Sequence, residues 1–325
     1  MLIRVLRLGA ITASVASILF LAAGASAATQ GVDLRVVAPG GKTLAEFRQY
    51  TGTVDIGTDP GANCFGQGTG GSGDRVRVTG PTALGAVRDA LETATDLRPL
   101  SITDAFLDDG FGLGVCGIAG FKSQGSSFWY LKRDHVGAQV SGSQLHVNQG
   151  DDILWYLSPT FPPPPELALV GPSRAQPTVP YQVTVYSYAD DGTRTPAAGA
   201  SVTHASHPTD AAGHTMVSSP VGTDLLRATR AQSIPSNQVK VCVNADLSKC
   251  PSSHGLRIVG SRRPDRIGGT RGRDSIASRG GSDVINLTAG GRDGVGCGDG
   301  ADKVIVAAGD HNDNIGSTCE QVVEN

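Results

Sequence analysis

Aromatic residues are scarce in this 325-residue chain, at 5% of the total, and Met and Trp occur only twice each. The formal net charge is −3, and the basic residues form no continuous stripe. We therefore expect no nucleic-acid partner, because nucleic-acid binding needs a concentrated positive surface. Motifs of the GxSxG, HExxH and P-loop types are also absent. The chain is not expected to be an enzyme, and a secreted hydrolase is only a remote alternative.

Long apolar runs are lacking outside the N-terminus. Arg4 and Arg7 precede an apolar run over residues 8–21, and the small residues Ala25, Ser26 and Ala27 follow. This order predicts a secretory signal peptide over residues 1–27, with an uncleaved membrane anchor as the alternative. After cleavage we expect no membrane span. The predicted location is extracellular, either free or associated with the cell surface.

Six cysteines fit an oxidising compartment. The CxxC spacing of zinc sites is absent, so disulfides are the better interpretation. Each expected domain contains two cysteines, which favours pairing within domains. The predicted disulfides are Cys64–Cys116, Cys242–Cys250 and Cys297–Cys319.

Glycine and proline are abundant, with 44 and 18 residues, which favours turns and strands over helices. We predict a mainly β, multidomain chain. A Pro-rich linker over residues 159–166 separates a first domain, residues 28–158, from a second, residues 167–250. A third domain covers residues 255–325.

The first domain is predicted to contain one helix over residues 82–95, with Thr82 as its N-cap. Cys116-Gly-Ile118, Trp129 and Gly150-Asp151 follow in that order. This pattern resembles the secreted domains similar to the C-terminal domain of transcobalamin, which are related to SLBB modules. The resemblance implies a β-grasp-like α+β fold. The chain departs from the family at Asp134 and His135, where Asn-Gly is common, and cobalamin binding does not carry over.

Aromatic residues near two predicted strands are weak candidates for ligand binding, namely Trp129, Tyr130 and Trp155. Strand alternation places neighbouring side chains on opposite faces. We therefore expect one member of each pair, Trp129/Tyr130 and Trp155/Tyr156, to be buried and the other exposed. Asp151 and Asp152 are interpreted as turn residues, because no His or Lys partner lies near them in the sequence.

The second domain shows short alternating strands at about ten-residue spacing, which is typical of a β-sandwich. Residues 210–213 and 226–228 carry a resemblance to bacterial immunoglobulin-like repeats. Such modules serve as spacers or adhesive units, and the resemblance implies an Ig-like β-sandwich here.

The third domain repeats an Asp about every nine residues, each followed two positions later by Ile or Val. The repeated positions are Asp265, Asp274, Asp283, Asp293 and Asp302. They resemble the RTX (haemolysin-type) nonapeptides, which form a parallel β-roll with calcium at its turns. Asp265, Asp283 and Asp302 are expected on one edge of the roll, and Asp274 and Asp293 on the other. The five aspartates are the predicted metal ligands, and Ca²⁺ is the predicted cofactor.

This repeat is degenerate, since most double glycines are missing and arginines lie between the aspartates. Arginines could replace some of the calcium by pairing with the ladder. Two interpretations stay open: at least one real calcium site, or a degenerate roll held by packing and the disulfide. The sequence favours a secreted or surface binding or adhesion-type protein with a calcium-associated tail. A corrinoid-like small-ligand binder is the alternative, and the extracellular partner itself is not indicated.

Overall fold

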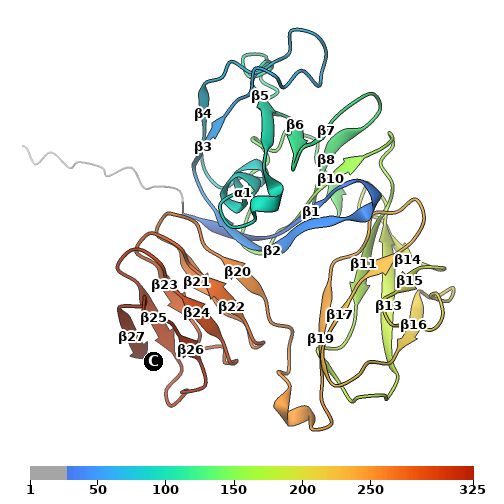
Figure 1. Ribbon diagram of the computed structural model, residues 1–325, viewed down its shortest axis with the longest axis vertical. Helices are drawn as coiled ribbons and strands as arrows, with labels where there is room; N and C mark the ends of the chain where they lie inside the picture. The colour runs from blue at the N-terminus through green and yellow to red at the C-terminus, as the bar shows by residue number, and fades with distance from the viewer. Residues whose placement is uncertain (1–27) are drawn as a thin grey trace, which may run out of the picture.

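A computed structural model describes residues 28–325, so the expected signal peptide lies outside the described range. This part of the chain is mainly β-structure with a single α-helix. Figure 1 shows an N-terminal module (residues 28–158) at the top, with a repeat module (residues 255–325) and a middle module (residues 166–250) below it. In residues 28–325, no helix has the length and apolar character needed to cross a membrane.

The N-terminal module is organised around strand β1. The spatial order of its main strands is β2 (Thr43–Thr51), β1 (Gln30–Val37), β10 (Asp152–Ser158), β8 (Phe128–Arg133) and β9 (Val136–Gly137). β1 runs parallel to β10, and the other neighbours are antiparallel. Two smaller sheets complete the module: β3 (Val54–Gly57) with β4 (Arg75–Val78), and β5 (Leu100–Thr103), β6 (Gly114–Ile118) and β7 (Phe121–Lys122).

The one α-helix, α1 (Ala83–Ala90), lies against this sheet and buries Leu84 and Val87 in the core. As predicted, Thr82 caps it, and its hydroxyl accepts a hydrogen bond from the Gly85 N–H at 3.1 Å. The helix ends before the predicted end at residue 95. The β-branched Thr93 and Thr95 are weak helix formers, which accounts for the earlier end.

The repeat module continues the N-terminal sheet. Strand β20 (Arg257–Val259) pairs in parallel with β2, with Arg48 opposite Ile258, so one nine-stranded sheet runs through both modules. Tyr50 of β2 is buried in the core of the repeat module. The N-terminal module therefore covers the first coil of the repeat, whose strand β20 would otherwise expose unpaired backbone groups.

The repeat module is a stack of short coils in which strands alternate between two parallel sheets. One sheet contains β20, β22 (Ser275–Ala277), β24 (Gly294–Gly296) and β26 (Asn314–Ile315). The other contains β21 (Arg266–Gly268), β23 (Val284–Asn286), β25 (Lys303–Val306) and β27 (Gln321–Glu324). The repeated apolar residues, such as Ile276 and Ile285, fill the thin core between the sheets.

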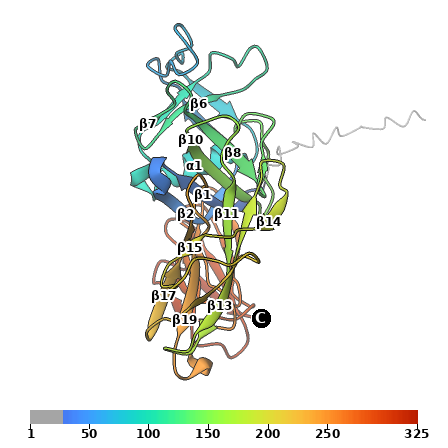
Figure 2. The ribbon, with the colours of Figure 1, turned by 90° about the vertical axis from the view of Figure 1, so that its right-hand side faces the viewer.

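The middle module is built from two main sheets around an apolar core that includes Leu167, Val185 and Val241. The first contains β11 (Glu166–Val170), β13 (Tyr181–Tyr188), β14 (Arg194–Pro196) and β16 (His214–Val217). The second contains β12 (Arg174–Ala175), β19 (Val239–Val243) and β17 (Gly222–Leu226). The short strands β15 (Ser201–Val202) and β18 (Ala228–Thr229) form a further pair. In Figure 2 this module lies in front of the repeat module.

The three disulfides join the predicted partners. Cys64–Cys116 lies in the N-terminal module, Cys242–Cys250 closes the end of the middle module, and Cys297–Cys319 ties the last coils of the repeat together. No free cysteine remains in the described residues.

Candidate functional site

The repeated aspartates form two ladders, one at each edge of the repeat module. On the first edge, the N–H groups of Asp265 and Asp283 each donate to Oδ1 of the next aspartate, Asp283 and Asp302, at 2.8 Å. On the second edge, the Asp274 N–H donates to Asp293 Oδ1 at 2.8 Å. The alternation between edges is as predicted. All five side chains are only 1–2% exposed, so their charges are largely removed from water.

The second carboxylate oxygen is satisfied in the first two coils. Ser261 donates from its N–H to Asp265 Oδ2 at 2.6 Å, and from its hydroxyl to Oδ1 at 3.1 Å. Thr270 makes the same pair of contacts with Asp274, the hydroxyl bond being 2.9 Å. Each hydroxyl residue lies four positions before its aspartate. In these coils the protein itself supplies the donors that a buried carboxylate needs.

Later coils lack that hydroxyl group. The residues four positions before Asp283, Asp293 and Asp302 are Arg279, Ala289 and Gly298. In these coils Oδ2 is buried and has no hydrogen-bond partner. The same holds for Oδ2 of Asp313, which extends the second ladder because its Oδ1 accepts the Asp293 N–H. A buried carboxylate oxygen without a partner is costly unless a proton or a cation neutralises it. The free oxygen is the one that the Ser261 and Thr270 backbone N–H groups bind in the first two coils, so the conformation of the turn also distinguishes the later coils.

Electrostatics in these coils oppose the ionised state. Burial raises the pKa of Asp283 to about 7, and the neighbouring carboxylates of Asp265 and Asp302 add to the shift. Burial also raises the pKa of Asp293 to about 7, with Asp274 and Asp313 acting in the same direction. The shifts show that the stacked carboxylates lack compensating positive charge.

Arginine side chains do not supply that charge. Within residues 28–325, no arginine forms an ion pair with a ladder aspartate. Arg279 instead pairs with Glu92, beyond the end of α1, and so joins the repeat module to the N-terminal module. The expectation that arginines replace calcium by pairing with the ladder is therefore wrong. The reason is geometric, because the aspartates point inward and the arginines project outward.

The tryptophans are part of the N-terminal core. Trp129 is 7% exposed, and its Nε1 donates to the Phe121 carbonyl at 2.8 Å. Trp155 is 2% exposed, and its Nε1 donates to the Ala83 carbonyl at 3.3 Å. The prediction of one exposed residue in each pair is wrong for Trp155 and Tyr156, since both are buried. Both faces of β10 are covered, one by the module's own core and the other by the middle module.

A cavity of about 290 Å³ lies beside these rings. Trp129, Tyr130 and Trp155 all contribute to its lining, together with Phe65 and Leu113. The Tyr130 hydroxyl is already engaged, because it donates to Asp190 of the middle module at 2.7 Å. The structure therefore brings the three predicted ligand-binding residues together, around a mainly apolar space.

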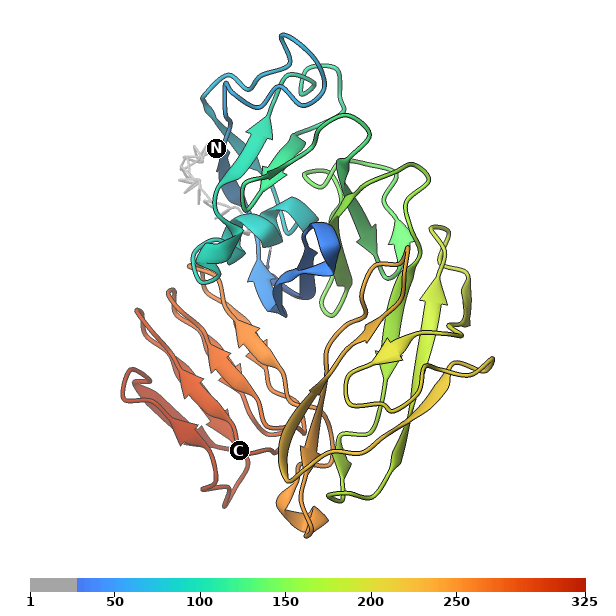
Figure 3. The same ribbon diagram turned by 45° about the vertical axis from the view of Figure 1, so that its right-hand side comes forward.

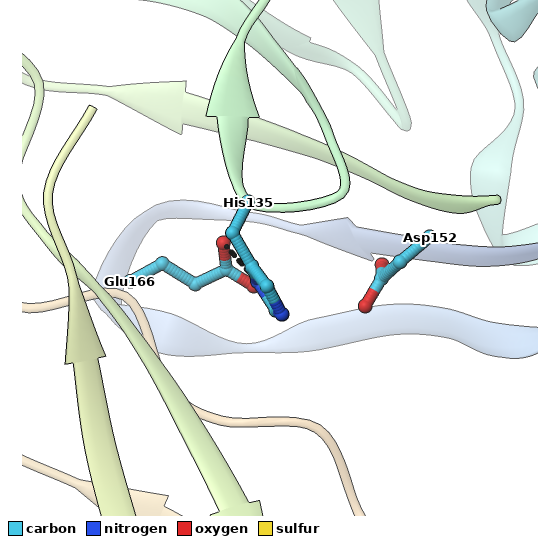
Figure 4. A group of neighbouring side chains, drawn as sticks. All are labelled: His135, Asp152 and Glu166. Atoms are coloured by element: carbon cyan, nitrogen blue, oxygen red, sulfur yellow. Dashed lines mark ion pairs between the residues drawn. The ribbon is translucent and has the colours of Figure 1, made fainter. Parts of the chain in front are cut away.

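A buried ionic cluster joins the N-terminal and middle modules (Figure 4). His135 lies in the turn between β8 and β9, and its Nδ1 is 3.1 Å from Glu166 Oε2. The other oxygen of Glu166 accepts a hydrogen bond from buried Arg35. One ligand atom each from His135, Asp152 and Glu166 lies within 4.8 Å of the others. Sequence reasoning missed this cluster because the three residues come from different segments that only the packed modules bring together.

The charges in this cluster largely balance one another. Burial acts to raise the pKa of Glu166, but His135 and Arg35 outweigh it and hold the pKa below its usual range. Burial raises the pKa of Asp152 to about 6, with Glu166 adding to the shift. Lys132 is also buried and lies 3.9 Å from Asp190. With Arg35 and Lys132 already present, we interpret the cluster as an ion-paired joint between modules and not as a metal centre.

Comparison with family models, with curated proteins and with solved structures finds no match to this chain. Function is therefore inferred from the geometry of the ladder, the cavities and the module joint.

Proposed function

We propose that the chain is a secreted, non-enzymatic binding or adhesion-type protein whose repeat module holds calcium. The observation that carries the proposal is the row of buried, unpartnered Oδ2 atoms in the later coils. Calcium prefers six to eight oxygen ligands, including carboxylates and backbone carbonyls. The donor set of the ladder fits this preference. A bound cation would neutralise carboxylates that now repel one another.

Calcium binding is proposed for only part of the ladder. Ions would be held by the aspartates that have a free buried oxygen, namely Asp283 and Asp302 on the first edge and Asp293 and Asp313 on the second. Asp265 and Asp274 would not, because Ser261 and Thr270 already occupy their oxygens. The proposal thus agrees with the first of the two interpretations of the sequence.

The folds proposed for the three modules support an extracellular role. The α1-crossed sheet suits a β-grasp-like domain similar to that of transcobalamin, the two facing sheets suit an Ig-like sandwich, and the coiled strands suit an RTX-like β-roll. The three disulfides are compatible with an oxidising, extracellular location. In this arrangement the repeat module supports the other two, and recognition takes place on the modules that it holds.

Calcium titration of the full chain tests the proposal. Hydrogen exchange resolved by peptide, with and without calcium, should show increased protection in residues 279–325 and little change in residues 255–276. At a calcium concentration about a thousandfold above Kd, the repeat should gain roughly 4 kcal/mol of stability.

Asp293→Asn should weaken this response, because the amide lacks the negative charge that the ion needs. Asp299→Asn is the matched control, since Asp299 is exposed and lies outside the ladder. Equal protection with calcium and with a chelator would refute calcium binding.

The cavity beside the tryptophans favours a second function, the binding of a small apolar ligand. Its volume of about 290 Å³ is at the lower limit of the ~300–1,000 Å³ found for drug-sized ligands. A whole corrinoid exceeds that space, so the corrinoid alternative would require contact at the cavity mouth only. Saturable quenching of tryptophan fluorescence by a small apolar probe would support this function. An unchanged spectrum with both apolar probes and a corrinoid would remove it.

A further inference from the structure

A second and larger cavity, of about 470 Å³, lies between the middle and repeat modules. Figure 3 shows the two modules below the N-terminal module, with their lower ends close together. The walls come from β19 and the loop closed by Cys242–Cys250 on one side, and from the turns at residues 271–275 and 291–292 on the other. The disulfide fixes the loop that forms one wall.

This cavity is lined by basic side chains from both modules. They are Lys240, Lys249, His254, Arg271, Arg273 and Arg292. Within residues 28–325, the five lysines and arginines of this set form no ion pair. Asp274 is the only acidic residue of the lining, and it is buried with both oxygens engaged by Thr270 and Leu256. The positive charge is therefore not neutralised by the protein.

His254 is held in the wall of the cavity by two contacts. Its Nδ1 is 2.9 Å from the Lys240 carbonyl, and its Nε2 is 3.2 Å from the Gly171 carbonyl. These two contacts hold the imidazole ring between β19, which contains Lys240, and the segment at Gly171.

Placement of the arginines follows the repeat. Arg273 and Arg292 each precede a second-edge aspartate, and these two aspartates stack directly through the Asp274 N–H bond to Asp293. The two arginine backbones are therefore roughly 5 Å apart, the spacing of neighbouring coils. The residues before the first-edge aspartates are Pro264, Ser282 and Ala301, which carry no charge. At the position directly before the aspartate, adjacent coils thus present like charges only on the edge that faces the middle module.

The composition of the lining indicates the chemistry of the ligand. No Phe, Tyr or Trp lines the cavity, so it lacks the large aromatic platform on which a base or a sugar ring usually stacks. Guanidinium groups bind phosphate and carboxylate through paired hydrogen bonds. The volume lies within the range of small-molecule sites. We propose that this cavity binds a compact polyanion that carries two or more neighbouring phosphate or carboxylate groups.

Isothermal titration calorimetry of the full chain tests this inference, with inorganic pyrophosphate and citrate as probes. Both probes chelate calcium, so the titrations are made in calcium-free buffer. One-to-one binding of either probe is expected, and the preferred probe distinguishes a phosphate site from a carboxylate site. Affinity should fall when salt rises from about 0.05 M to about 0.5 M, because the contacts are with exposed charges.

Arg273→Ala combined with Arg292→Ala should weaken binding by roughly tenfold or more. Arg266→Ala is the matched control, because Arg266 is exposed on another strand of the same module and does not line the cavity. Absence of binding by the unchanged chain, or equal binding by the double variant, would overturn the inference. A calcium titration of the same protein variants without either probe shows separately whether the proposed calcium sites are present. Failure of one proposal therefore does not hide failure of the other.

Discussion

Buried carboxylates occur in two regions of this protein and behave in opposite ways. At the module joint, Glu166 is almost fully buried, yet Arg35 and His135 hold its pKa below the usual range. In the ladder, burial raises the pKa of Asp283 to about 7. The comparison teaches that the partner within reach, and not burial by itself, decides the charge state.

A finer contrast exists within the ladder. Asp274 Oδ2 accepts the Thr270 N–H and Asp274 Oδ1 accepts the Thr270 hydroxyl, whereas Asp293 Oδ2 has no partner. The turn before the aspartate, through its backbone N–H and its hydroxyl, separates a self-sufficient coil from a coil that requires a proton or a cation. The predictions below test both contrasts.

Removing the charge at the joint should have the largest effect. Glu166→Gln leaves Arg35 buried without its anionic partner and should cost roughly 3 kcal/mol or more. Urea unfolding followed by tryptophan fluorescence measures this cost, because both tryptophans belong to the N-terminal module that contains Arg35. Glu46→Gln is the control at the same joint. Its pair with Arg227 has side chains that are 20–24% exposed, so water still screens it and it should be worth about 1 kcal/mol. Similar losses for both variants would contradict the comparison.

The two regions should respond to pH in opposite directions. The folded pKa of Glu166 is lowered, so its contribution is present above the unfolded pKa and is lost as pH falls through the folded value. The folded pKa values of Asp283 and Asp293 are raised to about 7, so the folded state binds more protons between pH values of about 4 and 7. Without calcium, the repeat should therefore lose stability as pH rises across that window, by up to about 1.4 kcal/mol per pKa unit for each group.

Calorimetric melting at several pH values, with and without calcium, checks this dependence. Calcium should remove most of the loss, since the ion takes the place of the proton on the same oxygens. A calcium-free repeat that is most stable at neutral pH would contradict the predicted loss of stability as pH rises.

Thr270→Val should destabilise the repeat without making that coil calcium-dependent. The substitution conserves side-chain shape and removes the hydroxyl donor to Asp274 Oδ1, which should cost about 1 kcal/mol, while Oδ2 keeps the Thr270 N–H and Oδ1 keeps the Leu256 N–H. Thr288→Val is the control, because the Thr288 hydroxyl contacts only the exposed side chain of Asn286. Thermal melting compares the two variants, and an equal effect would show that the hydroxyl at position 270 has no special role.

The reverse substitution should have the smallest effect. Ala289→Thr places a hydroxyl four residues before Asp293, where the Thr270 hydroxyl bonds Oδ1 of its own aspartate, and should stabilise the calcium-free repeat by less than about 1 kcal/mol. Asp293 Oδ2 should stay without a partner, so the calcium response of that coil, measured by hydrogen exchange, should persist. Ala308→Thr serves as the control, since Ala308 is exposed and is not at the equivalent position before an aspartate. Loss of the calcium response in Ala289→Thr would contradict the comparison within the ladder.

Local regularities of the sequence predicted much of the fold. The nine-residue period and the apolar residue two positions after each aspartate correctly indicated alternate edges and a thin core. The cysteine distribution also indicated the three pairs that form. Such features depend on neighbours in the chain, so a period or a spacing is enough to read them.

The candidate sites were predicted less well. Alternation along β10 suggested an exposed face near Trp155 and Tyr156, but packing by the middle module covers it. His135, Asp152 and Glu166 showed no shared pattern, and neither did the six basic residues of the larger cavity. These groups meet because modules distant in the sequence pack side by side, which a single strand pattern does not encode.

By itself, the sequence determined the mainly β character, the repeat with its aspartates at alternate edges, and the disulfide partners, since each follows from spacing along the chain. Only the tertiary structure decided which aspartates keep a free oxygen, which carboxylates gain a cationic partner, and where unpaired arginines gather. Those outcomes depend on burial and on charges supplied from other modules, because electrostatic interactions act through space once water is excluded.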